Sequence, residues 1–402
     1  MNHKSPKARL VLGDGSIFEG KAYGAKVSKA GEVVFSTGMT GYDLSLTDPS
    51  YAGQILTFTY PLIGNWGVPP KSFWESSKIH PVGLVISDLT THPNHWHMET
   101  TLNNWLIQEN VPAITGIDTR ALTQKLREKG VMLGKIIVRN EDIDFVDPNE
   151  RNLVAEVSIN ELKVHKSIVK SQRSNVNIGL LNCGAKQNII RCLTTRGATV
   201  YELPWNYDPF EIRRGVAAVE GLPSARSLTT KSSSTNEPKI KRALAGGKLL
   251  TGPRTLLPKL DGLVISNGPG NPKMAKETIA IIKIALKKKI PTFGICLGNQ
   301  LLALAAGGDT YKLKFGHRAQ NQPTIEIKSK RCYITTQNHG FAVDDKKLPS
   351  GFKRWFYNAN DNSNEGIAHV KLPFFSVQFH PEAAPGPTDT EFLFDKFMEK
   401  FK

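Results

Sequence analysis

One short motif constrains the fold of this 402-residue chain more than any other feature. An apolar run, Ile290–Ile295, leads into Gly294-Ile295-Cys296-Leu297-Gly298, and a helix-like segment, Asn299–Ala306, follows. This order predicts a strand, a sharp turn that carries a thiol, and a helix, which is the layout of a nucleophile elbow. The glycines permit strained backbone angles and close approach of the chain. The N-terminus of the helix favours negative charge, so we expect it to favour the nucleophilic thiolate form of Cys296.

A second segment supplies the partners that such a thiol needs. A cysteine in an apolar stretch is more often a small core residue than a nucleophile. However, Ser376–Glu382 has the pattern of a buried strand that ends in His380, with Glu382 two residues further on. A lone histidine at a strand end is also more often structural, but a thiol nucleophile needs a base, and the base needs an orienting group. The two segments together favour a catalytic triad of Cys296, His380 and Glu382.

The composition indicates a globular chain with more than one core. Its length favours two domains, and its contents of 40% hydrophobic and 22% charged residues are typical of soluble proteins. No apolar run reaches the length of a membrane helix, and the N-terminus lacks the apolar stretch of a secretory signal. The four cysteines show neither metal-ligand spacing nor disulfide density, which favours a reducing compartment. They are Cys183, Cys192, Cys296 and Cys332.

The net charge of +16 could suggest a nucleic-acid partner, but its distribution argues against one. Residues 213–256 hold nine lysines and arginines against two glutamates, so seven of the sixteen net charges lie in this stretch. The stretch has no aromatic residue and contains a run of serines. This composition predicts a solvated, disordered insertion, and neither a nucleic-acid nor a membrane partner is expected.

Two patterns divide the chain. In residues 1–150, short strand patterns, a Gly13-Asp14-Gly15 hairpin signal and two helical patterns predict a mixed β/α domain. A polar linker is expected at 151–175. From 176 to 402, strand and helix patterns alternate, which predicts a mostly parallel sheet flanked by helices. Ligands of such α/β sheets bind at the carboxyl ends of strands, where Cys296 and the loop Asn267-Gly268-Pro269-Gly270 are both expected.

The motifs together resemble a known family. The second half is similar to class I glutamine amidotransferases in Asn267–Gly270, Gly294–Gln300, Gln337–Phe341 and His380–Glu382. The first half is similar to the small subunit of carbamoyl-phosphate synthase. The motifs that carry this second likeness are Gly31–Phe35, Met39–Tyr42, Leu46–Tyr51, Tyr60–Asn65 and Gly116–Arg120. They span nearly the whole chain, apart from the expected insertion.

The resemblance implies a reaction and a set of binding residues. Glutamine is hydrolysed to glutamate and ammonia, and a synthetase subunit or domain uses the ammonia, bicarbonate and ATP to make carbamoyl phosphate. The residues implied to bind glutamine are Ser50, Gly268, Gly270, Leu297, Gln300, Asn338, Gly340 and Phe341. Since Ser50 belongs to the first half, we expect a site at the domain interface. We expect oxyanion donors from the Leu297 N–H and the Gly268–Gly270 loop.

No cofactor or metal is expected in this chain itself. It has no phosphate-binding loop of the Gly-x-x-x-x-Gly-Lys-Ser/Thr type and no carboxylate cluster suited to a metal. ATP and Mg²⁺ are therefore assigned to the synthetase partner, which is either a separate polypeptide or fused to this chain. The expected location is the cytoplasm, with the mitochondrial matrix as the alternative.

Some alternatives stay open. Without the resemblance, Gly268 and Gly270 could be turn glycines, Gln300 a solvated helix residue, Asn338 and Gly340 part of a hairpin turn, and Ser50 a helix cap. Many glutamine-using relatives have histidine at the position of Asn299. Asparagine at this position resembles the urea-cycle-type synthases, some of which use free ammonia and have lost the nucleophile. Because Cys296 is present, we expect an active glutaminase. The alternatives are a non-catalytic regulatory module and an amidotransferase for another acceptor, which the first-half motifs disfavour.

Overall fold

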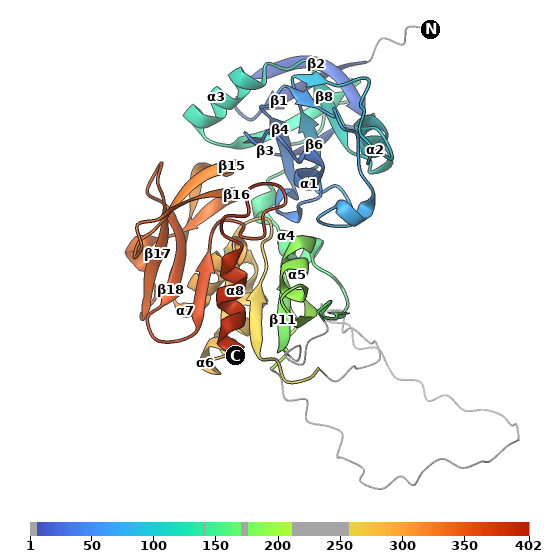
Figure 1. Ribbon diagram of the computed structural model, residues 1–402. Helices are drawn as coiled ribbons and strands as arrows, with labels where there is room; N and C mark the ends of the chain where they lie inside the picture. The colour runs from blue at the N-terminus through green and yellow to red at the C-terminus, as the bar shows by residue number, and fades with distance from the viewer. Residues whose placement is uncertain (1–5, 140, 170–175, 211–256, 402) are drawn as a thin grey trace, which may run out of the picture.

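The fold is known from a computed structural model that describes residues 6–139, 141–169, 176–210 and 257–401. The insertion predicted at 213–256 lies outside these described residues. Figure 1 shows a β-barrel, formed by the first part of the chain, above an open sheet with helices, formed by the rest. This two-part architecture confirms the predicted α/β fold class.

Seven strands close into the barrel in the order β1-β2-β8-β6-β4-β3-β9. Side chains alternate between the two faces of a strand, and in β1 the inward positions are Ala8, Leu10 and Leu12. The strands are β1 (Lys7–Leu12), β2 (Ile17–Gly24), β3 (Lys29–Ser36), β4 (Gln54–Phe58), β6 (Gly83–Val85), β8 (Pro112–Thr115) and β9 (Met132–Val138). The short strands β5 (Leu62–Ile63) and β7 (Asp88–Leu89) pair with each other outside the barrel.

Three helices accompany the barrel. They are α1 (Tyr42–Leu46), α2 (Leu102–Gln108) and α3 (Thr119–Lys129). The Asp118 side chain caps α3 by accepting a hydrogen bond from the Ala121 N–H at 2.9 Å, which is the usual start of a helix. The two helical patterns of this half predict helices over Leu102–Glu109 and Thr119–Lys129, and α2 and α3 confirm both.

Part of the segment expected as a linker is regular structure. It contains α4 (Leu153–Val157) and β10 (Lys163–His165), and β10 pairs antiparallel with β12 (Ala198–Pro204). The segment therefore supplies an edge strand to the second sheet. Its three residues are half-buried or exposed, so no apolar periodicity marks the strand in the sequence.

Among the described residues, the second sheet has ten strands, in the order β10-β12-β11-β13-β14-β19-β18-β17-β15-β16. The five strands from β12 to β19 in this order are parallel, and the strands at both edges are antiparallel. The remaining strands are β11 (Val176–Asn182), β13 (Gly262–Ile265), β14 (Thr292–Ile295), β15 (Thr310–Glu326), β16 (Cys332–Val343), β17 (Phe352–Asn358), β18 (Asn364–His369) and β19 (Phe374–Val377).

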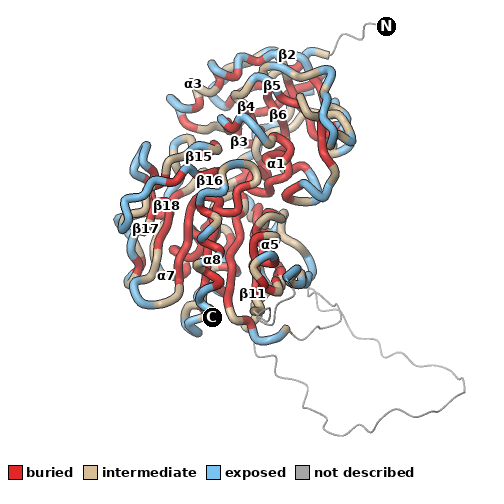
Figure 2. The backbone as a smooth tube through the Cα atoms, in the orientation of Figure 1, coloured by how far each residue is buried: buried red, intermediate tan, exposed pale blue. Residues whose placement is uncertain are grey.

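Helices cover both faces of the parallel strands. Residues of α5 (Gln187–Thr194) and α8 (Phe392–Met398) belong to one apolar core, and residues of α6 (Lys276–Lys287) and α7 (Leu297–Ala306) to another. Strands that are buried on both faces are mostly apolar, as β13 and β14 are, with Thr292 the one polar residue of the two. Figure 2 shows buried backbone along these central strands and along the barrel. None of the helices in the described ranges has the length and apolar character required to cross a membrane.

The predicted strand–turn–helix around the thiol is confirmed. β14 ends at Ile295, α7 begins at Leu297, and Cys296 between them has φ 54° and ψ −102°. Such a φ is rare for a residue with a side chain. Close packing fixes the turn, because a Cβ atom on Gly298 would lie only 2.2 Å from the backbone oxygen of Ile265 in the neighbouring strand.

We therefore predict that Gly298→Ala destabilises the protein by about 1–3 kcal/mol or more, because the added methyl group has no room beside Ile265. The measurement is the free energy of unfolding in urea. Ala306→Gly, at the other end of α7, is the control and should cost about 1 kcal/mol or less. Equal effects of the two changes would contradict the close-packing account.

Candidate active site

The thiol and the imidazole meet because their strands are parallel neighbours. β14 and β19 pair in register, with Ile295 opposite Val377, so the residues that follow them emerge at the same sheet edge. The Cys296 N–H donates to the Val377 carbonyl at 2.8 Å, and the His380 N–H donates to the Thr336 carbonyl at 2.9 Å. Both side chains are about 1% exposed, and Cys296 lies close enough to raise the pKa of His380, although His380 Nε2 has no hydrogen-bond partner among the described residues.

Glu382 orients the imidazole. His380 Nδ1 lies 2.6 Å from Glu382 Oε1, and both residues are buried. Burial alone would lower the pKa of His380, but Glu382 and the charge of the Cys296 thiolate outweigh it and raise that pKa to about 10. Burial would raise the pKa of Glu382, but Lys186 and His380 lower it to about 2. The arrangement therefore favours the imidazolium form of His380 beside the Glu382 carboxylate.

Lys186 completes this charge chain and was not singled out in the sequence. It precedes α5, is 2% exposed, and its Nζ lies 3.1 Å from Glu382 Oε1. Burial would lower the pKa of Lys186, but Glu382, Glu75 and Asp48 raise it, so its ammonium is retained. It lies directly before α5, and nothing in the local sequence pattern indicates its burial.

The residues implied to bind glutamine lie around one pocket with the thiol. All eight of them line it together with Cys296: Ser50, Gly268, Gly270, Leu297, Gln300, Asn338, Gly340 and Phe341. Leu297 is the first residue of α7, and the first N–H groups of a helix have no partner within the helix. The pocket holds only about 30 Å³ of free volume, roughly the share of one water molecule.

Asp48 joins the two domains at this pocket. It lies in the barrel part, and its carboxylate accepts hydrogen bonds from Asn267 Nδ2 at 3.2 Å and from Asn338 Nδ2 at 2.9 Å. It also accepts the Ser50 N–H at 2.9 Å, while the Ser50 hydroxyl oxygen accepts from Asn267 at 2.9 Å. The expected placement of Ser50 at a domain interface is therefore confirmed. Asp48 was missed because its partners are more than 200 residues away in the sequence.

Asn299 points away from the pocket. It is fully buried, and its amide donates to Gln378 Oε1 at 3.1 Å and accepts from the Ser376 hydroxyl at 2.8 Å. Gln378 in turn has its Nε2 3.7 Å from the Cys296 sulfur. Asn299, which replaces the common histidine, thus contacts Gln378 and orients it toward the thiol. It is not among the residues that line the pocket.

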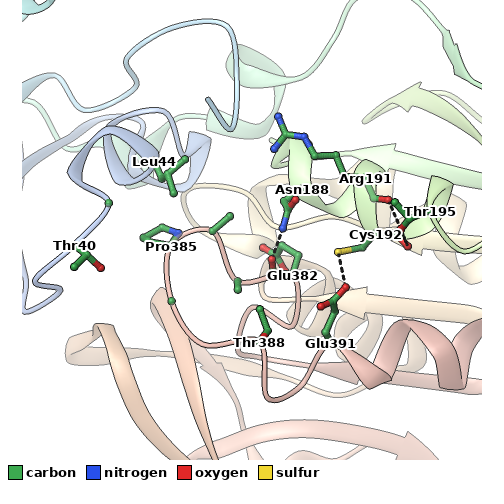
Figure 3. A pocket seen from close by; sticks show the side chains of 14 residues that line it. Thr40, Leu44, Asn188, Arg191, Cys192, Thr195, Glu382, Pro385, Thr388 and Glu391 are labelled. Atoms are coloured by element: carbon green, nitrogen blue, oxygen red, sulfur yellow. Dashed lines mark hydrogen bonds between the residues drawn. The ribbon is translucent and has the colours of Figure 1, made fainter. Parts of the chain in front are cut away.

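A larger cavity of about 480 Å³ lies on the other side of Glu382. Figure 3 shows it between Asn188 and Arg191 of α5, Leu44 of α1 and the loop that carries Pro385. Neither Cys296 nor His380 lines this cavity. The narrower pocket contains the thiol and the glycine loops, so we assign the chemistry to the narrower one.

One buried group of side chains could face a single ion. Ring nitrogens of His317 and His339 and a carboxylate oxygen of Glu365 lie within 4.8 Å of one another. However, His317 Nε2 lies 2.9 Å from Asp361 Oδ2, and its Nδ1 lies 3.4 Å from Glu365 Oε1. Burial alone would lower the pKa of His317, but these carboxylates raise it to about 9. These ion pairs account for the group in the structure, and the absence of a metal stays a prediction.

The buried Lys186 ammonium should stabilise the fold through Glu382. We predict that Lys186→Met costs about 3 kcal/mol, because it removes a buried partner of the Glu382 charge. The measurement is urea unfolding of Lys186→Met, of Glu382→Gln, and of the double variant. The double variant should be less destabilised than the sum of the two single changes. Additive effects would show that the two charges do not interact.

The His317 ion pairs predict a specific pH dependence. The folded pKa of His317 is raised to about 9, above the unfolded value near 6.5, so its stabilisation is fully present below pH 6.5 and is lost as pH rises through 9. His317→Gln should therefore lower the free energy of unfolding by about 2 kcal/mol more at pH 6 than at pH 10. A cost that is independent of pH would contradict this assignment.

Comparison with known proteins assigns both parts of the chain. The family model for the carbamoyl-phosphate synthase small chain, CPSase domain, matches residues 10–136, and the model for class I glutamine amidotransferases matches residues 179–400. The carbamoyl phosphate synthase arginine-specific small chain of Saccharomyces cerevisiae is 41% identical over 417 residues, which cover 100% of this chain and 90% of that protein. The protein of the same description from Neurospora crassa is 40% identical over 98% of this chain and 79% of its own length.

Larger proteins match as well. The multifunctional protein CAD of Squalus acanthias is 44% identical over 405 residues, which cover 98% of this chain but 16% of that protein. The chain spans between 16% and 24% of the length of the six larger relatives compared with it. The matches cover both the barrel part and the sheet part, and so the chain belongs to the family of carbamoyl-phosphate synthase small chains, with a class I glutamine amidotransferase domain.

Proposed function

We propose that this chain hydrolyses glutamine to glutamate and ammonia, and that the ammonia passes to a synthetase subunit or domain. The observation that carries the proposal is the meeting of Cys296 and His380 at adjacent strand ends, beside a pocket lined by the residues expected to bind glutamine. A thiol, a base and an orienting carboxylate in this geometry are suited to acyl transfer.

The first half of the reaction forms a thioester. The Cys296 thiolate attacks the carbonyl carbon of the glutamine side-chain amide, and the Leu297 N–H and the Gly268–Gly270 loop stabilise the oxyanion. The His380 imidazolium, held by Glu382, gives its proton to the leaving nitrogen. The C–N bond breaks, ammonia departs, and a glutamyl thioester stays on Cys296.

The second half restores the enzyme. Neutral His380 removes a proton from water, and the resulting hydroxide attacks the thioester carbonyl carbon. The C–S bond then breaks, glutamate leaves, and the thiolate–imidazolium pair forms again. No step needs a cofactor in this chain, so ATP and Mg²⁺ are assigned to the synthetase partner, which combines ammonia with bicarbonate to make carbamoyl phosphate.

We place this chain in the cytoplasm, with the mitochondrial matrix as the alternative. The support is chemical: all four cysteines are free, which suits a reducing compartment. Detection of the native protein in separated cytosolic and mitochondrial fractions decides between the two.

The proposal predicts a split between two nitrogen sources. With the synthetase partner present, Cys296→Ser should abolish glutamine-dependent carbamoyl phosphate synthesis but keep synthesis from added ammonia, because only the thioester route needs the thiol. The expected loss of glutaminase kcat is at least about 1,000-fold. The measurement is carbamoyl phosphate formation from each nitrogen source.

Cys332→Ser is the matched control, because Cys332 is an exposed thiol far from the pocket lining. It should leave both activities unchanged. Loss of both activities in Cys296→Ser, or of neither, would overturn the proposed role. The second outcome would favour a non-catalytic regulatory module.

A further inference from the structure

One buried cation in the pocket, Arg318, has no carboxylate partner among the residues that the structure describes. Arg318 lies on β15, opposite Asn338 of β16, and lines the same pocket as Cys296. It is 4% exposed, and within the described ranges no carboxylate lies within 4.0 Å of its guanidinium. One nitrogen, Nη1, donates to the Phe315 carbonyl at 2.8 Å, while the buried Nε has no hydrogen-bond partner among the described residues.

The nearest acidic side chain of the pocket is already occupied. Glu32 comes from the barrel, and its carboxylate lies 2.6 Å from Lys312 Nζ. It also accepts hydrogen bonds from Asn149 at 3.2 Å and from Gln54 at 3.4 Å. Glu32 therefore satisfies Lys312 and not Arg318. Burial lowers the pKa of Arg318, although Glu32, Tyr51 and Cys296 act in the opposite direction.

An unpaired buried charge is costly, and such groups gather at binding sites. The guanidinium is also held in place by its surroundings. A Cβ atom on Gly316 would lie 2.6 Å from Arg318 Nη1, and one on Gly340 would lie 3.3 Å from Nη2. The two glycines thus leave room for the guanidinium beside the backbone of the pocket wall. A planar cation fixed in this way is suited to a carboxylate.

We propose that Arg318 binds the α-carboxylate of glutamine and selects for substrates that carry it. This inference rests on the proposed glutaminase function and deepens it. The side-chain amide of glutamine must reach Cys296, and the α-ammonium would be repelled by a guanidinium. The α-carboxylate is the one anionic group of the substrate, and it supplies the charge that Arg318 lacks. Because Lys cannot form the bidentate pair, Arg318→Lys should be only a partial replacement.

The test measures binding, so it does not depend on turnover. In the full chain carrying Cys296→Ser, calorimetry gives the Kd of three ligands, with Arg318 intact and with Arg318→Gln. Glutamine has both α groups, glutaramate lacks the amino group, and 4-aminobutanamide lacks the carboxylate. We expect Arg318→Gln to weaken glutamine and glutaramate by about 10- to 100-fold. It should change the Kd of 4-aminobutanamide by less than about threefold.

Two further variants keep the result interpretable. Arg331→Gln, an exposed arginine in the turn before β16, should alter no Kd. Arg318→Lys should fall between the parent and Arg318→Gln, and it replaces Arg318→Gln if that variant does not fold. Equal weakening of all three ligands, or of none, would overturn the proposal. Glutamine binding without glutaminase activity in the unaltered chain would contradict the proposed function and leave the role of Arg318 intact.

Discussion

The parallel pairing of β14 with β19 is the constraint on which the site depends. Because the two strands run in the same direction in register, Cys296 and His380 leave the sheet at one edge, although they are far apart in the sequence. Backbone hydrogen bonds from both residues to neighbouring strands fix their positions. The sheet thus provides a rigid frame, and the short turn at Cys296 lifts the thiol into the pocket.

A buried row of side chains with alternating charge raises the pKa of His380. Lys186, Glu382 and His380 follow one another at hydrogen-bond distance, and all are nearly inaccessible to water. The order of charges favours the imidazolium form of His380. Behind the thiol, Asn299 orients Gln378, so the substitution of the common histidine leaves a satisfied hydrogen-bond network.

The pocket is shared between the two domains and is nearly closed. Asp48 bridges to Asn267 and Asn338, and Glu32 of the barrel pairs with Lys312 of the sheet. A free volume of about 30 Å³ is too small for glutamine. Substrate entry therefore requires movement of the side chains that line the pocket.

Local sequence motifs were sufficient to predict several elements of the fold, whereas contacts between residues far apart in the sequence could not be predicted. The elbow, the helices α2 and α3 and the two-part architecture follow from periodicity and turn residues, so the sequence was sufficient for them. Asp48, Lys186 and Arg318 could not be predicted, because each depends on partners or burial that only the folded chain creates. The strand β10 was missed because its three residues carry no apolar pattern.

The central claim is that Cys296 is the nucleophile that attacks glutamine. The most direct measurement is rapid acid quenching of the chain during turnover of isotopically labelled glutamine, followed by mass spectrometry of the peptides. The account predicts one glutamyl thioester, located on the peptide that contains Cys296 and absent from Cys296→Ser. Turnover without any adduct on Cys296, or an adduct that persists in Cys296→Ser, would contradict it.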